Sequence, residues 1–191
     1  DDKKYNLLDE PWICVMKENG EVKELSLMDV LLHAHQYRRL AGELPTQDVA
    51  VLRLLLAVLQ TVVYRYDTDG NEDELVETED AYERWKEIWN DGKLPEKPIR
   101  EYLTKWKERF YLYDSDRPFY QVPKAVNGTK YTAAKLNGEI SESNNKLRLF
   151  VNRARNEKKF LSDSEAARWL LYLNGFDDAS AKPKQSGLPS P

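Results

Sequence analysis

The residues best suited to binding chemistry lie in one stretch near the C-terminal end of the chain. Residues 144–159 carry six basic side chains and one acidic one, with Phe150 among them and Asn145 and Asn152 on either side. Basic side chains neutralise phosphates, an aromatic ring stacks on a nucleobase, and an asparagine amide hydrogen-bonds a base edge. This mixture is typical of a nucleic-acid-binding loop, although a charged, exposed hairpin explains it about as well.

Other residues with chemical potential have simpler explanations. Cys14 lies in a predicted strand with no histidine near it in sequence, which favours a structural thiol over a nucleophile. His33 and His35 are two residues apart, so on a helix they point to different faces and cannot chelate one metal ion together. Asp114 and Asp116 flank a predicted turn, where capping is a simpler role than acid–base catalysis. We expect no catalytic residues and no cofactor.

An acidic run at residues 67–80 contains eight carboxylates and no basic residue. Asp67, Asp69 and Asn71 alternate like the beginning of a calcium-binding EF-hand loop. The sixth position of such a loop needs glycine and is Glu72 here, and the twelfth needs glutamate and is Thr78. We expect a solvated loop and no metal site.

Composition and charge limit the function classes further. The 191 residues, of which 41% are hydrophobic and 32% charged, predict about one folded domain. There is no P-loop, dinucleotide-binding glycine fingerprint, nucleophile elbow or zincin motif. The net charge of −4 divides into −7 for residues 1–140 and +3 for residues 141–191. This asymmetry is a weak indication of an anionic partner at the C-terminal end.

The sequence carries no signal for export or membrane insertion. The longest apolar stretch, residues 49–63, is interrupted by Arg53, Gln60 and Thr61, and falls short of the ~20 residues that span a bilayer. The first residues hold no apolar segment of signal-peptide type. A single cysteine excludes an internal disulfide. We therefore expect a cytoplasmic protein with no membrane partner.

The elements that must position these residues indicate an α+β fold, rich in helices, with an N-terminal β-hairpin and short additional strands. Residues 12–25 alternate in hydrophobicity around Asn19-Gly20, which supplies the positive φ angles of a tight hairpin turn. Ser26 is the expected N-cap of the next helix, with Asp29 at the capping-box position. This helix should end near residues 37–42.

Two longer helices are expected after it. Residues 49–66, with Thr46 as N-cap, are apolar on most faces and predict a buried central helix. Residues 78–90 form an amphipathic helix with an aromatic stripe that we expect to anchor the core. The stripe consists of Tyr82, Trp85 and Trp89.

The C-terminal half is expected to contain fewer regular elements. Residues 98–109 predict a helix, and residues 110–113 and 119–122 predict extended segments around a turn. Residues 127–145 are rich in turn-forming types and predict a loop. A last helix, residues 166–173, should start from the capping sequence at residues 162–165 and end at Asn174-Gly175.

Three separated segments resemble one protein family. Residues 5–13, Tyr-Asn-Leu-Leu-Asp-Glu-Pro-Trp-Ile, are similar to the start of the CasA family, the large subunit of the type I-E CRISPR surveillance complex Cascade. Residues 44–48, Leu-Pro-Thr-Gln-Asp, and residues 110–121, from Phe-Tyr-Leu-Tyr-Asp through Arg-Pro-Phe-Tyr-Gln, are similar to two later landmarks of that family. Their order and spacing agree, so the resemblance covers essentially the whole chain.

The resemblance also implies a domain organisation. The family protein is considerably longer, so residues 1–179 would be the front portion of its large N-terminal domain. Residues 180–191 contain three prolines and are expected to form a flexible tail or a truncated continuation. We accordingly expect the chain to be a piece of a longer polypeptide.

The function implied by the resemblance is binding rather than catalysis. The family subunit lies near the 5′ handle of the guide RNA and recognises the protospacer-adjacent motif (PAM) in double-stranded target DNA. It helps to separate the strands and takes part in recruiting a helicase-nuclease. The implied partners are therefore the other Cascade subunits, the guide RNA, the target duplex and that nuclease. The alternative is a protein–protein scaffold domain without direct nucleic-acid contact.

The resemblance assigns the candidate site to the basic stretch. A family loop near the guide RNA and the PAM carries a Phe-Val-Asn core, which here is Phe150-Val151-Asn152. It implies that Phe150 stacks or wedges and that Asn152 makes a polar contact, with the arginines beside them on phosphates. The predicted nucleic-acid-binding residues are Asn145, Lys146, Arg148, Phe150, Asn152, Arg153, Arg155, Gly175 and Lys182.

Two departures from the family pattern affect this assignment. Some relatives place a glycine-rich loop after the last helix; here Gly175 is kept, but Asp177 and Asp178 replace glycines and would repel phosphate. Some relatives also hold a zinc ion through paired cysteines after the Phe-Val-Asn loop. This sequence has Lys158-Lys159 there and no cysteine, so we expect no zinc.

Overall fold

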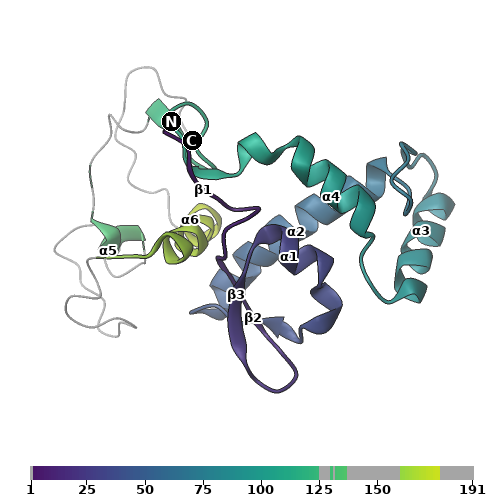
Figure 1. The fold of residues 1–191 in the computed structure, drawn as a ribbon, viewed down its shortest axis with the longest axis horizontal. Coiled ribbons are helices and arrows are strands. Elements are labelled where there is room, and N and C mark those ends of the chain that lie inside the picture. The colour runs from purple at the N-terminus through teal and green to yellow at the C-terminus, as the bar shows by residue number, and fades with distance from the viewer. Residues whose placement is uncertain (1, 125–129, 131, 137–159, 177–191) are drawn as a thin grey trace.

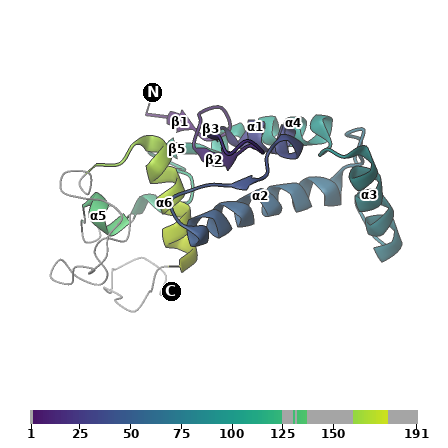
Figure 2. The same cartoon turned by 90° about the horizontal axis from the view of Figure 1, so that it is seen from below.

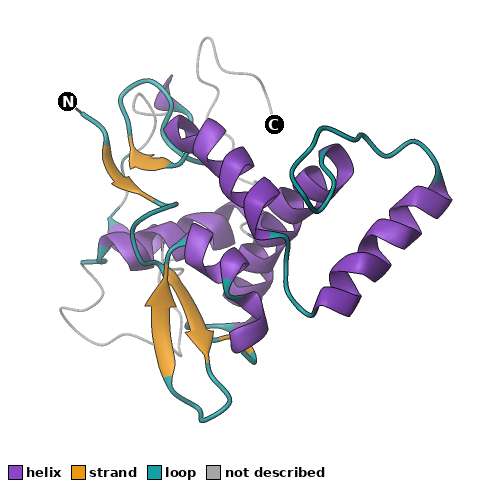
Figure 3. Ribbon diagram, turned by 45° about the vertical axis from the view of Figure 1, so that its right-hand side comes forward, coloured by secondary structure: helices purple, strands orange, loops and turns teal. Residues whose placement is uncertain are grey.

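The computed structural model describes residues 2–124, 130, 132–136 and 160–176, and it confirms a helix-rich α+β fold (Figure 3). Its strands are β1 (Lys4–Asn6), β2 (Ile13–Met16), β3 (Val22–Leu25), β4 (Arg39–Leu40) and β5 (Tyr111–Tyr113). Its helices are α1 (Leu27–Leu32), α2 (Pro45–Arg65), α3 (Thr78–Asp91), α4 (Glu96–Lys105), α5 (Ala133–Leu136) and α6 (Asp163–Phe176), with 3₁₀ turns at Ala34–Gln36 and Lys107–Arg109.

Two small antiparallel sheets contain these strands. The β2–β3 hairpin is confirmed, and β4 pairs with the other edge of β2. The turn is not the one predicted, because Gly20 alone adopts a positive φ (+84°) and Asn19 does not. The result is a three-residue loop closed by a 2.9 Å bond from the Lys17 amide to the Glu21 carbonyl. β1 forms the second sheet with β5, far along the chain.

The first helix begins as predicted and ends early. The Ser26 hydroxyl accepts a 3.1 Å hydrogen bond from the Asp29 amide, which confirms the N-cap. α1 ends at Leu32 rather than near residues 37–42, and a 3₁₀ turn follows. The chain must return to β2 at this point, since Leu40 of β4 pairs with Val15.

α2 is the central helix, and its start and exposure differ from the prediction. Its N-cap is Leu44 rather than Thr46, because Pro45 occupies the first helical position, where its missing N–H costs nothing. One face of α2 packs against α4 and α6. The opposite face is more than 40% exposed at Val49, Leu52 and Leu56.

α2 is also the one helix of the described residues that is long and apolar enough, by length and composition, to cross a membrane. By this criterion, the expectation that the apolar stretch is too short to span a bilayer was wrong. Half of its most apolar window is buried inside the fold. A mostly apolar helix with that burial is the core helix of this domain.

α2 is about 30 Å long, given a rise of ~1.5 Å over its 21 residues. α6 crosses the N-terminal half of α2, whereas α3 extends away from the domain at its C-terminal end (Figures 1 and 2). α4 returns from α3 to the core, where Ile99 and Leu103 are fully buried. α4 starts at Glu96 and ends at Lys105, so both ends lie earlier in the chain than the predicted 98–109.

The orientation predicted for α3 was wrong. Tyr82, Trp85 and Trp89 are 66%, 39% and 85% exposed. The residues of α3 that turn inward are Arg84 and Ile88. The predicted stripe exists, but it faces away from the core.

The strand predicted at residues 110–113 is β5, whereas residues 119–122 form no strand. The Phe119 amide donates to the Tyr111 carbonyl at 2.8 Å, and Tyr120 has a φ of +55°, so the chain turns. Phe119 stacks on Phe110 with ring centroids 5.5 Å apart. This family landmark therefore forms part of the core.

Candidate nucleic-acid interface

Most of the predicted nucleic-acid-binding residues lie outside the described part of the chain; they are Asn145, Lys146, Arg148, Phe150, Asn152, Arg153, Arg155 and Lys182. The described residues on either side show which elements flank residues 137–159. α5 precedes it and packs against α6, and α6 begins four residues after Lys159. Both flanks of residues 137–159 are therefore fixed to one helix.

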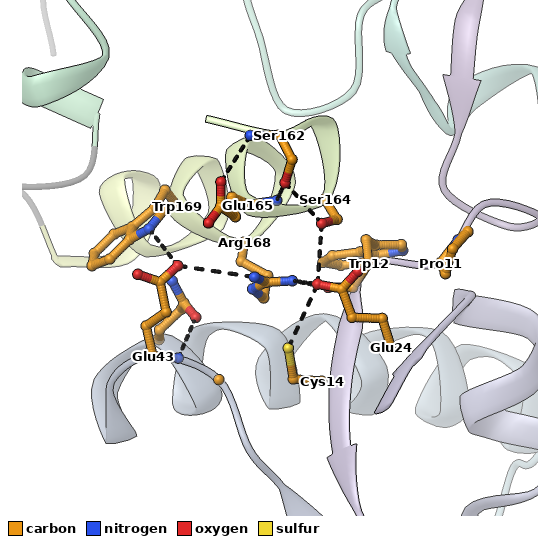
Figure 4. Close-up of polar contacts among 12 residues, drawn as sticks. Pro11, Trp12, Cys14, Glu24, Glu43, Ser162, Ser164, Glu165, Arg168 and Trp169 are labelled. Atoms are coloured by element: carbon orange, nitrogen blue, oxygen red, sulfur yellow. Dashed lines mark hydrogen bonds and ion pairs between the residues drawn. The ribbon is translucent and has the colours of Figure 1, made fainter. Parts of the chain in front are cut away.

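The N-terminus of α6 is held by a reciprocal capping box. The Ser162 hydroxyl accepts a 3.2 Å bond from the Glu165 amide, and the Ser162 amide donates a 2.8 Å bond to Glu165 Oε2 (Figure 4). The prediction that residues 162–165 open the last helix is confirmed. Two backbone N–H groups that would otherwise lack partners are satisfied, so the helix starts at a defined residue.

Arg168 fixes α6 to the N-terminal hairpin. Its side chain is buried, and Nη1 donates to the Trp12 carbonyl at 2.8 Å and to Glu24 Oε1 at 2.5 Å. Ser164 donates to the same Glu24 oxygen at 3.1 Å (Figure 4). Because the arginine is buried and the carboxylate is 37% exposed, the arginine carries most of the desolvation cost.

A second carboxylate joins α6 to the segment before α2. Trp169 Nε1 donates to Glu43 Oε1 at 3.0 Å, and Arg168 Nη2 lies 3.9 Å from the same oxygen. The Glu43 amide in turn donates to the Oε1 atom of fully buried Gln47 at 3.0 Å. The landmark at residues 44–48 thus holds the start of α2 against α6.

Gly175 was predicted to lie in a loop after the last helix, but it lies within α6. α6 continues through it to Phe176. A Cβ on Gly175 would lie 3.7 Å from Arg53 Nη1 and 4.0 Å from Ala50 Cβ, both of α2. The helix extends further than its sequence predicted because its last turn packs on α2. The proposed role of Gly175 in DNA contact stays a prediction.

The residues examined for catalysis are occupied in structural roles. Asp114 Oδ1 accepts bonds from the Asp116 and Arg117 amides, and these bonds lower the pKa of the Asp114 carboxyl. This confirms the turn-capping interpretation. The His33 ring lies 3.0 Å from its own helix's Asp29 carbonyl, and His35 is exposed. Neither the histidines nor the aspartates are arranged as an acid–base pair.

Cys14 also fits a structural role. Its thiol is half-buried and lies 3.8 Å from Glu24 Oε1. Burial is the main cause that raises the pKa of this thiol to about 11. A thiol with that pKa is almost entirely protonated at neutral pH and is a weak nucleophile.

The acidic run forms a loop stabilised by its own side chains. Asp67 accepts bonds from the Asn71 side chain and from the Asn71 and Asp69 amides, and the pKa of its carboxyl is lowered as a result. Within the described ranges, no group of three His, Cys, Asp or Glu side chains is arranged to hold a metal ion.

Sequence reasoning did not find the Arg168 cluster. Arg168 and Glu24 are 144 residues apart, and neither belongs to a motif. The available signal was an arginine beside Trp169 on the apolar side of the last helix. A basic residue in that position implies a buried carboxylate partner, but the sequence does not say which one.

Comparisons with known proteins agree with the family resemblance. The family model for CRISPR-associated protein Cse1 matches residues 6–188. A curated relative from Thermus thermophilus, CRISPR-associated protein CasA/Cse1, is 33% identical over 174 residues, which are 91% of this chain and 32% of the relative. The chain thus spans about one third of that relative's length.

Solved structures lead to the same family. The crystal structure of Thermobifida fusca Cse1 has a TM-score of 0.65 and 35% identity, covering 90% of this chain and 30% of that protein. A chain in a CRISPR RNA-guided surveillance complex, in a pre-nicking state, has a TM-score of 0.73 at 20% identity. The match covers 92% of this chain and 34% of that one. At that identity the second likeness establishes the fold. The family model's match over nearly the whole chain, together with these relatives, shows that this protein belongs to the CasA/Cse1 family of CRISPR-associated proteins.

Proposed function

We propose that this chain is the front portion of a non-catalytic subunit of a cytoplasmic CRISPR RNA-guided surveillance complex. In that role it helps to recognise the PAM of double-stranded target DNA and contacts the 5′ handle of the guide RNA. It works by positioning and shape recognition followed by opening of the duplex. Its partners are the other protein subunits, the guide RNA, the target duplex and a recruited helicase-nuclease.

One observation carries the proposal beyond family membership. The most basic stretch of the chain, residues 144–159, lies between two flanks that are both fixed to α6. The capping box at Ser162 and the buried Arg168 cluster hold the second flank rigidly against the domain. A basic segment presented from a rigid support is what phosphate contact with a defined register requires.

The test is a reconstitution with guide-loaded complex lacking its large subunit. Full-length protein is added as wild type or as Phe150→Ala/Asn152→Ala, and the affinity for target duplex with and without a PAM is measured. Loss of one stacking contact should weaken PAM-dependent binding by about 5- to 150-fold. The matched control is Phe160→Ala, since Phe160 is 77% exposed and lies beside the same segment.

Salt dependence separates phosphate contacts from base contacts. Replacing both Arg153 and Arg155 by glutamine should reduce the slope of log affinity against log salt by about 2, because two phosphate contacts are lost. Normal PAM-dependent binding by the Phe150/Asn152 variant would place the site elsewhere. If wild-type protein neither joins the complex nor changes its DNA affinity, the proposed function is wrong.

A protein–protein scaffold is the second candidate, and the exposed aromatic face of α3 favours it. In that case the basic segment is incidental to assembly. Charge reversal at Arg153 and Arg155 would then leave both subunit association and DNA affinity unchanged. The same reconstitution measures both quantities.

A further inference from the structure

The face of α3 that points away from the domain is unusually aromatic. Trp89 is 85% exposed and Tyr82 66%, and Trp85, one turn before Trp89, is 39% exposed. Their spacing places them along one side of the 14-residue helix. Among the described residues, neither indole contacts another ring or a cation. Tryptophan and tyrosine are the residue types most enriched at the centres of protein interfaces.

Arg84 causes this orientation. Its Nη1 donates to the Val63 carbonyl at 2.8 Å and to the Asp73 carbonyl at 2.9 Å, while Nη2 pairs with the Asp73 carboxylate. The guanidinium thus satisfies backbone at the end of α2 and in the following loop. Because this bonding needs Arg84 turned inward, the aromatic side is turned outward. The outward face is built into the fold rather than left by poor packing.

The surroundings of this face are strongly acidic. Residues 67–91 hold eleven acidic and two basic side chains, a net charge of −9. Arg84 is already bonded to Asp73, and Lys86 pairs with Glu83. Such a surface repels nucleic acid and anionic lipid headgroups, and it attracts a basic partner.

The face already shows the chemistry of cation binding. Lys86 Nζ lies 5.7 Å from the centre of the Tyr82 ring. The indoles of Trp85 and Trp89 are better cation acceptors than a phenol ring, and arginine is the preferred cation for such stacking. An arginine- or lysine-bearing surface would find aromatic planes and acidic side chains together here.

We propose that this face of α3, formed by Tyr82, Trp85 and Trp89, binds a basic segment of a second protein, whose arginine or lysine side chains lie over the indoles. The acidic surroundings of this face, with a net charge of −9 over residues 67–91, complement the charge of such a segment. The inference rests on the proposed function in one respect: the second protein is taken to be another subunit of the surveillance complex.

The test uses full-length protein and the guide-loaded complex lacking it. We expect Trp89→Ser to weaken association by about 30-fold, the factor for one interface hot spot. Trp106→Ser is the matched control, since Trp106 is 38% exposed on another part of the domain, and it should change association by less than about threefold. Melting curves of both variants establish that they fold.

A charge-reversal variant of α3 tests whether the partner is basic. Glu79→Lys/Glu83→Lys should weaken association if the partner is basic, whereas tighter association would show an anionic partner and overturn the proposal. A photo-crosslinking residue at position 89 should join a lysine- or arginine-bearing peptide of another subunit. Crosslinks only to RNA, to DNA or within the same polypeptide would overturn it.

The two hypotheses fail differently in this experiment. If wild type joins the complex and Trp89→Ser joins equally well, the α3 interface is wrong and the proposed function stands. If wild type does not join at all, the proposed function fails and this inference fails with it.

Discussion

The Oε1 atom of Glu24 is the meeting point of three side chains from distant parts of the chain. Arg168 and Ser164 of α6 donate to it at 2.5 and 3.1 Å, and the Cys14 thiol lies 3.8 Å from it. The arginine balances the charge of this carboxylate, which lies beside a partly buried thiol. Burial is the main cause that disfavours a thiolate at Cys14, and the charge of the same carboxylate adds to it against the opposing charge of Arg168.

Cys14 should therefore react slowly with thiol reagents. A pKa of about 11, against an ordinary value of 9.0, leaves about 100-fold less thiolate at about pH 8. We expect alkylation of the native protein by iodoacetamide to be slower by at least that factor than in concentrated urea. The rate should rise about tenfold per pH unit across this range, because the group is titrated far below its pKa. Fast labelling of the native protein would contradict the placement of Cys14 against Glu24.

At the scale of elements, two glycines show how α2 is fitted into the fold. A Cβ on Gly42 would lie 2.5 Å from Gln47 Oε1 and 2.7 Å from Asp48 Oδ1, at the start of α2. Gln47 is fully buried, so its side chain has little free space into which it could shift. Gly175 in α6 has only ordinary contacts at 3.7–4.0 Å. The first glycine is required by close approach, and the second is not.

Alanine at these two positions should have opposite effects. Gly42→Ala should lower the free energy of unfolding by about 1–3 kcal/mol through overpacking. Gly175→Ala should raise it by about 0.5–1 kcal/mol, because alanine favours a helix interior. Denaturant titration of both variants measures this. If Gly175→Ala also leaves DNA affinity unchanged in the reconstituted complex, Gly175 is not a DNA-contacting residue.

The elements predicted correctly from the sequence are those determined by residues close to one another in the chain. The caps at Ser26 and Ser162 act within three residues, and the hairpin follows from alternation around one turn. The orientation of α3 was not predictable in this way, because its stripe is equally compatible with either side facing inward. Arg84 decides it by reaching carbonyls at residues 63 and 73, which no local pattern encodes.

The candidate site was predicted from composition and from the family resemblance. The family is confirmed, but the contacts of individual residues are not tested. The family assignment was correct, and the described residues place the flanks of the basic stretch on α6. The individual contacts of Phe150 and Asn152 stay predictions. Gly175 was misplaced because the last turn of α6 depends on packing against Ala50 and Arg53, which lie more than a hundred residues earlier.

At the scale of the whole molecule, α2 separates the two binding regions that we propose. Its N-terminal half carries α6, which holds both flanks of the basic stretch, and its C-terminal end carries the acidic, aromatic face of α3 (Figure 2). The chain's uneven charge follows this division. A nucleic-acid contact and a basic protein partner would thus be held at a fixed distance by one helix.

Arg168 should be the most sensitive polar residue of this arrangement. Arg168→Met leaves the Trp12 carbonyl without its donor and the Glu24 carboxylate without its cation, and we expect a loss of about 2–3 kcal/mol, moderated by the partial exposure of Glu24. The melting temperature should fall by about 4–12 °C. Arg100→Met, which breaks an exposed pair with Glu96, should change the melting temperature far less. Equal effects of the two substitutions would show that the cluster does not stabilise the domain.

The distance in sequence between Glu24 and Arg168 also has a consequence during synthesis. Ribosomes add about 5–20 residues per second, so the 144 residues between them take about 7–30 s to appear. During that interval the hairpin is complete, yet Glu24 has no arginine and Trp12 has no donor for its carbonyl. β1 likewise waits for β5, which lies more than a hundred residues later. The N-terminal strands of this domain thus gain their last stabilising contacts only when α6 emerges.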